Sequence, residues 1–181
     1  MKISAPRRFL SVIRNWLTRQ DGTATIEFVI LFPTFLWLFF SSFEIGIYMT
    51  RSVLLDRSVD MSVRDLRLGV MSPMTQEELK RRICVNAMMI SNCENVVTVE
   101  LTPISTTTWD VPANGVSCIQ RNEPIQPVVE FTPGGQNEIM SVRVCAILDP
   151  FFRTTPLVLQ MPLDASGGYA IVSTSVFVNE P

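Results

Sequence analysis

The sequence contains no histidine, and only 18% of its 181 residues are charged. Without imidazole, the chain has no Ser-His-Asp or Cys-His catalytic group, no histidine-bearing zinc site and no histidine-based pH switch. The charged fraction is below the roughly 25% of an average soluble domain. Because 47% of the residues are hydrophobic, disorder of the whole chain is disfavoured. A chain of this length is expected to hold one compact domain and an appendage.

The basic residues are concentrated at the N-terminus, although the net charge is only −2. Residues 1–20 hold five basic residues and no acid, namely Lys2, Arg7, Arg8, Arg14 and Arg19. The whole chain has 15 basic and 17 acidic residues. Without these five basic residues and Asp21, residues 23–181 hold 10 basic and 16 acidic residues, a net charge of −6. Because a nucleic-acid-binding domain carries a basic surface, we do not expect this acidic part of the chain to bind nucleic acid. A basic tail before an apolar run instead predicts a membrane segment with a cytoplasmic N-terminus.

An uncharged run of sixteen residues extends from Phe28 to Phe43 and has a glutamate on each side. Because crossing roughly 30 Å of hydrocarbon takes about 20 residues at 1.5 Å each, we expect the transmembrane helix to include the flanks and to span 23–49. Pro33 is tolerable in such a helix. The alternative is a cleaved secretory signal, but the run exceeds the usual h-region of about 7 to 15 residues and lacks a convincing small-residue cleavage site.

A short motif, GTATIEF, occupies residues 22–28 at the start of this run. A carboxylate at the lipid boundary is costly and indicates a partner or a function, and glycine lets the backbone enter a protease cleft. The motif resembles the prepilin peptidase site of type IV pilin-like proteins, in which a basic leader is followed by a glycine, four residues, a glutamate and a phenylalanine. With FEIGI at residues 43–47, residues 7–69 are similar to the TadE/TadF pseudopilins, the minor pilin-like proteins of the Tad (Flp) pilus system.

The resemblance implies cleavage between Gly22 and Thr23, which makes Glu27, followed by Phe28, the fifth residue of the mature protein. The new α-amine on Thr23 would be largely charged at neutral pH. Two helices offset by four residues, about 6 Å, would bring Glu27 of one subunit to the amine of its neighbour and set their axial register. The alternative is a glutamate at the interface without a partner.

Two residues near the other end of the run are weaker candidates. We expect Glu44 to be a solvated residue at the membrane interface, with a role in helix packing as the alternative. Gly46 would permit the close approach of another helix.

The pattern becomes amphipathic after Met49. Apolar residues recur on one helical face, namely Leu55, Val59, Val63, Leu66 and Val70. We therefore expect the helix to continue from the membrane through 50–71 and to end near Gly69; a separate core helix is the alternative. Thr75 and Glu78 form a capping box that predicts a second helix, ending near Ser91.

Strand signals dominate the C-terminal half of the chain. Alternating or continuous apolar runs occupy 96–101, 139–148 and 169–178, with 128–131 as a fourth candidate. The predicted fold class is α+β, in which a small antiparallel sheet packs on the helices. The expected organisation is a basic cytoplasmic leader, a transmembrane helix, an amphipathic helix and a periplasmic α+β domain. These parts cover 1–22, 23–49, 50–71 and 72–181.

The four cysteines lie in the part that the charge rule places outside the cytoplasm. An even number of cysteines in an oxidising compartment predicts two disulfides with three possible connectivities. We favour Cys84–Cys93, which ties a helix to the residues after it, and Cys118–Cys145, which fixes a long loop to a strand. A metal site is the alternative, but CxxC spacing and histidine are both lacking.

The resemblance implies a structural protein, not an enzyme, without a cofactor or a small-molecule substrate. Its expected partners are the inner membrane, a prepilin peptidase, and other pilin-like subunits with their assembly machinery. The protein would lie in the inner membrane as a single-pass subunit or enter a surface pilus used in adherence. Two alternatives remain: a pseudopilin of a type II secretion or competence system, and a membrane-anchored periplasmic enzyme or binding module.

Overall fold

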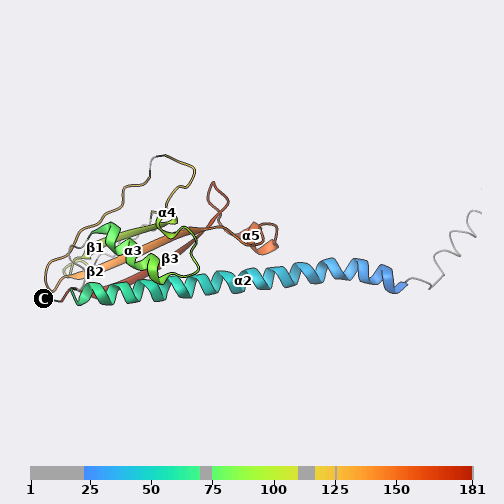
Figure 1. Cartoon of the computed structure of the whole chain (residues 1–181), viewed down its shortest axis with the longest axis horizontal. Helices are drawn as coiled ribbons and strands as arrows, with labels where there is room; N and C mark the ends of the chain where they lie inside the picture. The colour runs from blue at the N-terminus through green and yellow to red at the C-terminus, as the bar shows by residue number, and fades with distance from the viewer. Residues whose placement is uncertain (1–22, 70–74, 110–116, 125, 181) are drawn as a thin grey trace, which may run out of the picture. The chain divides into compact units, whose positions relative to one another are not determined.

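The computed structural model describes residues 23–69, 75–109, 117–124 and 126–180 of the chain (Figure 1). The predicted leader 1–22 and the turn at Ser72-Pro73 lie outside the described residues. Packing divides the chain into two compact units, 1–40 and 41–181. The described elements are a long N-terminal helix followed by a helix, two short helical turns and three strands, and the fold class is α+β, as predicted.

Helix α2 extends from Thr23 to Arg67 without interruption. Pro33 lies inside it and does not end the helix, as expected for a proline in an apolar segment. The predicted end near Gly69 is confirmed: Gly69 has a φ of 65°, which favours glycine, and its N–H donates to the carbonyl of Leu66 at 3.0 Å. The amphipathic segment therefore continues the apolar helix and is not a separate element.

The part of α2 after residue 40 belongs to the second compact unit. The predicted apolar face is buried, and its described members, Leu55, Val59, Val63 and Leu66, join the hydrophobic core. Between them lie Ser58 and Ser62, which are fully buried and donate to the helix carbonyls of Leu55 and Ser58. Small hydroxyl side chains on this face allow the rest of the core to approach the helix closely.

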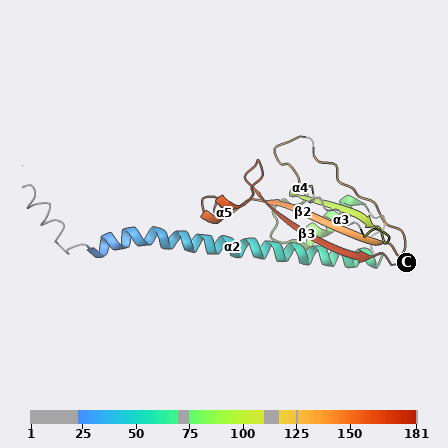
Figure 2. The same ribbon diagram turned by 180° about the vertical axis from the view of Figure 1, so that it is seen from behind.

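The sheet has three antiparallel strands in the order β1-β2-β3, namely β1 (Val97–Ile104), β2 (Ile139–Leu148) and β3 (Tyr169–Val178). Val99, Val144 and Ile171 represent the face that lines the same core as α2. Figure 2 shows β3 alongside this helix. The central strand β2 is buried on both faces, which explains its nearly continuous apolar sequence.

The second predicted helix, α3 (Gln76–Asn86), begins at the expected cap. The side chain of Thr75 accepts a hydrogen bond from the backbone N–H of Glu78 at 3.3 Å. The helix ends earlier than predicted. A turn with Asn92 at a φ of 56° separates it from the short helix α4 (Cys93–Val96), which leads directly into β1.

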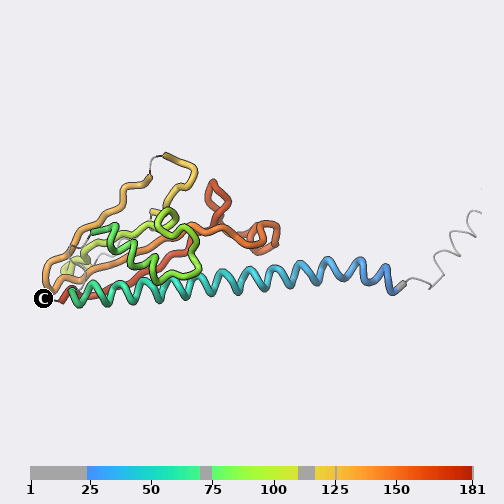
Figure 3. The backbone as a smooth tube through the Cα atoms, viewed as in Figure 1, coloured from blue at the N-terminus to red at the C-terminus, as the bar shows by residue number. Residues whose placement is uncertain are grey.

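The strand predictions succeed for the sheet and fail for the connection between β1 and β2. The bounds of β2 and β3 are those predicted, but 128–131 forms only an isolated parallel bridge, from Phe131 to Leu101 on β1. Figure 3 traces the described parts of this connection. A short helix that the sequence analysis did not predict, α5 (Pro156–Gln160), follows β2. It is too short to show helical periodicity.

Candidate assembly and anchoring site

The predicted assembly residues lie at the beginning of α2. Gly22 is outside the described residues, and Thr23 is the first residue of the helix. Glu27 is exposed on the helix, and Phe28 is 60% exposed, with its ring stacked on that of Phe32 at 4.8 Å between centroids. Both predicted residues are thus on an accessible helix surface, where a neighbouring subunit can contact them.

The apolar surface of the first helical unit is uncovered. From residue 24 to residue 40, every side chain is exposed or half-buried, and most of them are apolar. By length and composition, α2 is able to cross a membrane. Because such a surface is unfavourable in water, a membrane is a compatible environment for this part of the helix.

Gly46 lies on an exposed stretch of α2. A Cβ added at this position would meet no atom within 4 Å, so the fold of this chain does not require glycine there. The carbonyl of Gly46 accepts a hydrogen bond from the hydroxyl of Thr50 at 2.7 Å. The close helix approach predicted at Gly46 does not occur within the described part of the chain, and an approach by another subunit stays a prediction.

Glu44 is buried, with 1% exposure, so the expectation of a solvated interfacial residue is wrong. The backbone N–H groups of Phe151 and Phe152 donate to its Oε1 and Oε2 atoms at 3.0 Å and 2.8 Å. Two amide donors compensate the carboxylate for the loss of water. This contact fixes the segment after β2 to α2, and we refer to it as the Glu44 clamp.

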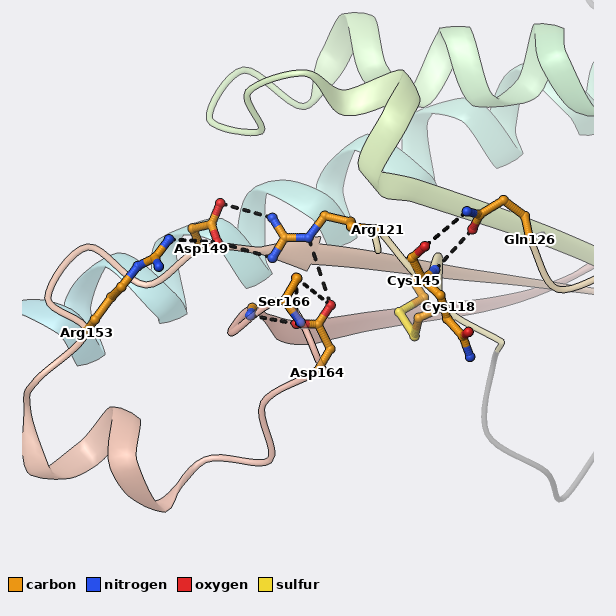
Figure 4. Close-up of polar contacts among 10 residues, drawn as sticks. Cys118, Arg121, Gln126, Cys145, Asp149, Arg153, Asp164 and Ser166 are labelled. Atoms are coloured by element: carbon orange, nitrogen blue, oxygen red, sulfur yellow. Dashed lines mark hydrogen bonds and ion pairs between the residues drawn. A yellow bond between two sulfur atoms is a disulfide. The ribbon is translucent and has the colours of Figure 1, made fainter. Parts of the chain in front are cut away.

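A polar cluster beside the clamp joins α2 to both neighbouring strands. Arg51 on α2 donates to the carbonyl of Asp149, just after β2, at 2.8 Å and to the hydroxyl of Tyr169 on β3 at 2.7 Å. Arg121 from the β1–β2 connection donates to both carboxylate oxygens of Asp149, at 3.0 Å and 3.1 Å (Figure 4). Arg153 approaches the same carboxylate at 3.4 Å.

The second acid of the cluster, Asp164, organises the turn before β3. Its carboxylate accepts hydrogen bonds from the N–H groups of Ser166 and Gly168 and from the Ser166 hydroxyl, and Arg121 lies 3.9 Å away (Figure 4). The hydrogen bonds from Arg121 lower the pKa of Asp149 below its ordinary value. For Asp164, burial acts to raise the pKa, but the hydrogen bonds from Ser166 and Gly168 outweigh it and lower the pKa.

All four cysteines are in disulfides, and the pairs are those that the sequence analysis favoured. Cys84 on α3 is joined to Cys93 at the start of α4, with Cα atoms 5.5 Å apart. Cys118 is joined to the buried Cys145 on β2, with Cα atoms 5.3 Å apart. The second disulfide holds the β1–β2 connection over the face of the sheet that does not contact α2, close to Arg121 (Figure 4).

Sequence reasoning missed the clamp and the polar cluster. For Glu44, the only signal was an acid in an apolar setting, which is costly unless it is paired. For Arg51, Arg121 and Asp149, each residue looks like an ordinary surface charge in its local sequence.

Comparison with known proteins links the beginning of α2 to a protein family. Residues 22–64 match the family model of the TadE-like protein, and no curated protein and no solved structure matches the chain. The matched segment contains the GTATIEF motif, the apolar part of α2, Glu44 and much of the amphipathic face. It supports a membrane-associated protein of a Tad pilus system and disfavours an enzyme. Through this N-terminal segment, the chain is similar to the TadE-like family.

Proposed function

We propose that this chain is a minor pilin-like subunit of a Tad-type pilus, that a prepilin peptidase cuts it between Gly22 and Thr23, and that it acts in assembling the pilus used in adherence. The observation that carries the proposal is the TadE-like match over residues 22–64, which begins at the proposed cleavage site. Its second support is the uncovered apolar helix that starts at Thr23.

The proposed mechanism is lateral packing of helices in the membrane. After cleavage, the Thr23 ammonium and the Glu27 carboxylate lie at the edge of a low-dielectric phase, where either charge alone is unfavourable. A neighbour displaced by four residues, about 6 Å along the helix, pairs the two charges and selects one axial register. The exposure of Glu27 on α2 is compatible with this pairing.

The proposed orientation places the leader in the cytoplasm and the C-terminal domain in the periplasm. The five basic residues before residue 20 support this orientation. The two disulfides also support it, since disulfides form and persist in oxidising compartments. The domain would then be free to contact other components of the pilus machinery.

N-terminal sequencing of the protein extracted from membranes tests the cleavage. The proposal predicts a mature chain that starts at Thr23 and an uncut precursor in Gly22→Ala. A matched control is Gly46→Ala, which adds the same methyl group to an open position on α2 and should leave cleavage unchanged. A wild-type chain that starts at Met1, or beyond residue 41, contradicts the proposal.

The register role of Glu27 needs a separate experiment, because it acts after cleavage. Glu27→Ala should still yield Thr23 as the first residue but should reduce surface pili. Asp56→Ala, which removes another exposed acid of α2, is the control and should assemble pili normally. Normal pili in Glu27→Ala would contradict the pairing and leave the cleavage result unaffected.

A further inference from the structure

The segment that follows the Glu44 clamp is apolar and exposed. Residues 151–163 read FFRTTPLVLQMPL, and Arg153 is the only charged residue among these thirteen. Phe151 is 64% exposed, Leu159 on α5 is 71% exposed and Leu163 is 39% exposed. Apolar side chains gathered on one exposed segment indicate an interaction surface for a protein or a membrane.

The position of the segment in the fold favours a membrane over a protein as its partner. The rings of Phe151 and Phe152 contact that of Phe43, with centroids 6.3 Å and 6.0 Å away. Phe43 is the last residue of the uncharged run of α2, and the clamp residue Glu44 follows it. Both views show α5 beyond the end of the sheet (Figure 1, Figure 2). The exposed segment therefore lies at the level where the lipid-compatible part of the helix ends.

We propose that residues 151–163 form a membrane-interface anchor, which lies among the lipid headgroups and upper acyl chains of the leaflet next to the C-terminal domain. The inference rests on α2 spanning the membrane, as in the proposed function. The occupant of the surface is lipid of that same membrane. The rings of Phe151 and Phe152 contact Phe43, the last residue of the uncharged run, so the membrane that α2 crosses is the apolar phase nearest to the segment.

The chemistry of the segment fits the interfacial layer and not the hydrocarbon centre. Phenylalanine and leucine side chains, such as those of Phe151 and Leu159, are among those that interfacial segments bury at the boundary between headgroups and acyl chains. Arg153, with its side chain 67% exposed, is suited to phosphate groups at that depth. Irregular backbone on either side of α5 is not tolerated where lipid offers no hydrogen bonds, so the segment stops at the boundary.

The clamp gives the anchor a mechanical role. Because Glu44 holds the amides of Phe151 and Phe152, α2 and the anchor share one depth at the lipid boundary. The buried carboxylate is satisfied by protein donors and does not have to reach water. The anchor therefore fixes how far the C-terminal domain stands from the membrane, a second constraint on subunit position beside the one proposed for Glu27.

Depth-dependent fluorescence quenching tests the proposal on the full chain in vesicles of phosphatidylethanolamine and phosphatidylglycerol. All native cysteines are disulfide-bonded, so a single new thiol can carry an environment-sensitive fluorophore under non-reducing conditions. The test position is Leu159→Cys on α5. The water-exposed control is Met88→Cys, at 88% exposure in the α3–α4 turn, and the lipid control is Leu31→Cys in the uncharged run.

We expect the probe at residue 159 to show blue-shifted emission and to lose fluorescence to nitroxide lipids labelled near the headgroup. The probe at residue 88 should show neither effect, and the probe at residue 31 should be quenched by lipids labelled deep in the acyl chain. If residue 31 is quenched and residue 159 behaves like residue 88, the anchor is overturned while the spanning helix stands. If residue 31 is also unquenched, the membrane span and the anchor are both overturned.

A second measurement keeps the result independent of probe chemistry. Leu159→Ser in the unlabelled chain should make the segment 151–163 more accessible to a protease added to intact vesicles, because its hold on lipid is weakened. Met88→Ser is the matched control and should leave cleavage of this segment unchanged. Equal protection of the segment in wild type, in Leu159→Ser and in detergent solution would contradict the anchor.

Discussion

The carboxylate of Glu44, in the membrane-proximal part of α2, accepts a hydrogen bond from the backbone N–H of Phe152 at 2.8 Å across a separation of 108 residues. The adjacent amide of Phe151 donates to the other carboxylate oxygen. An acid at the end of an apolar helix therefore serves to close the fold. It connects the segment matched by the TadE-like family to the C-terminal part of the chain, which that match does not cover.

Removing the clamp should destabilise the C-terminal domain. Glu44→Ala leaves the part-buried amide donors of Phe151 and Phe152 without their acceptor, at a cost of up to about 1–3 kcal/mol for each group that water does not reach. We expect a lower free energy of unfolding for the full chain in detergent micelles, and faster proteolysis after β2. Glu44→Gln keeps one carbonyl acceptor and should lose less.

The clamp prediction has a control on the same helix. Asp56→Ala removes an acid that is exposed and should change the unfolding free energy by less than about 0.5 kcal/mol. If Glu44→Ala were as stable as Asp56→Ala, the two hydrogen bonds would not contribute to stability.

The two disulfides should contribute unequally. Cys118–Cys145 closes a loop with a sequence separation of 27, and Cys84–Cys93 closes one with a separation of 9. The chain-entropy model assigns them about 3.5 and about 2.6 kcal/mol. Urea unfolding of the paired cysteine-to-alanine variants measures both values. The larger loss is expected for the Cys118–Cys145 pair, whereas a larger loss for the other pair would show that the unfolded chain does not set the difference.

Acid should weaken the polar cluster through Asp149. The hydrogen bonds from Arg121 hold its pKa below the ordinary value of 3.8, so the unfolded chain takes up this proton first as the pH falls. The stabilisation is therefore complete above about pH 5, decreases as the pH passes through 3.8, and is lost below the folded pKa. Its size should be modest, below about 1 kcal/mol, because the side chain of Asp149 is half-exposed.

Asp149→Asn tests this prediction. The variant should be less stable than the wild type at pH 7, and the difference should shrink as the pH approaches 3. Asp56→Asn, on the exposed face of α2, is the control. A difference between Asp149→Asn and the wild type that is constant from pH 7 to pH 3 would show that the loss does not come from the carboxylate charge.

Gly46 provides a test of helix packing between subunits. Since an added Cβ meets no atom within 4 Å, Gly46→Leu should leave the folding of the single chain nearly unchanged and should keep cleavage at Thr23. If another helix approaches closely at this position, the larger side chain prevents that approach and reduces pilus assembly. Normal pili in Gly46→Leu would show that the position faces lipid or water in the assembled state.

Local patterns in the sequence determined the long helix, the start of the second helix and two of the strands. The buried face of α2, the end of that helix at Gly69, the cap at Thr75 and the bounds of β2 and β3 all follow from periodicities and signals that extend over a few residues. The family resemblance was also local, because the GTATIEF motif and the apolar run after it form one continuous segment, which the TadE-like match covers.

The tertiary structure alone decided where the isolated polar residues go. Arg51 meets Tyr169 across 118 residues, Arg121 meets Asp149 across 28, and Glu44 meets two backbone amides, which have no side-chain signature at all. The segment 128–131 has the composition of a strand but forms a single bridge. A sequence pattern records what a residue requires, such as burial or a hydrogen-bond partner. Which distant group meets that requirement depends on how the helix and the sheet pack together.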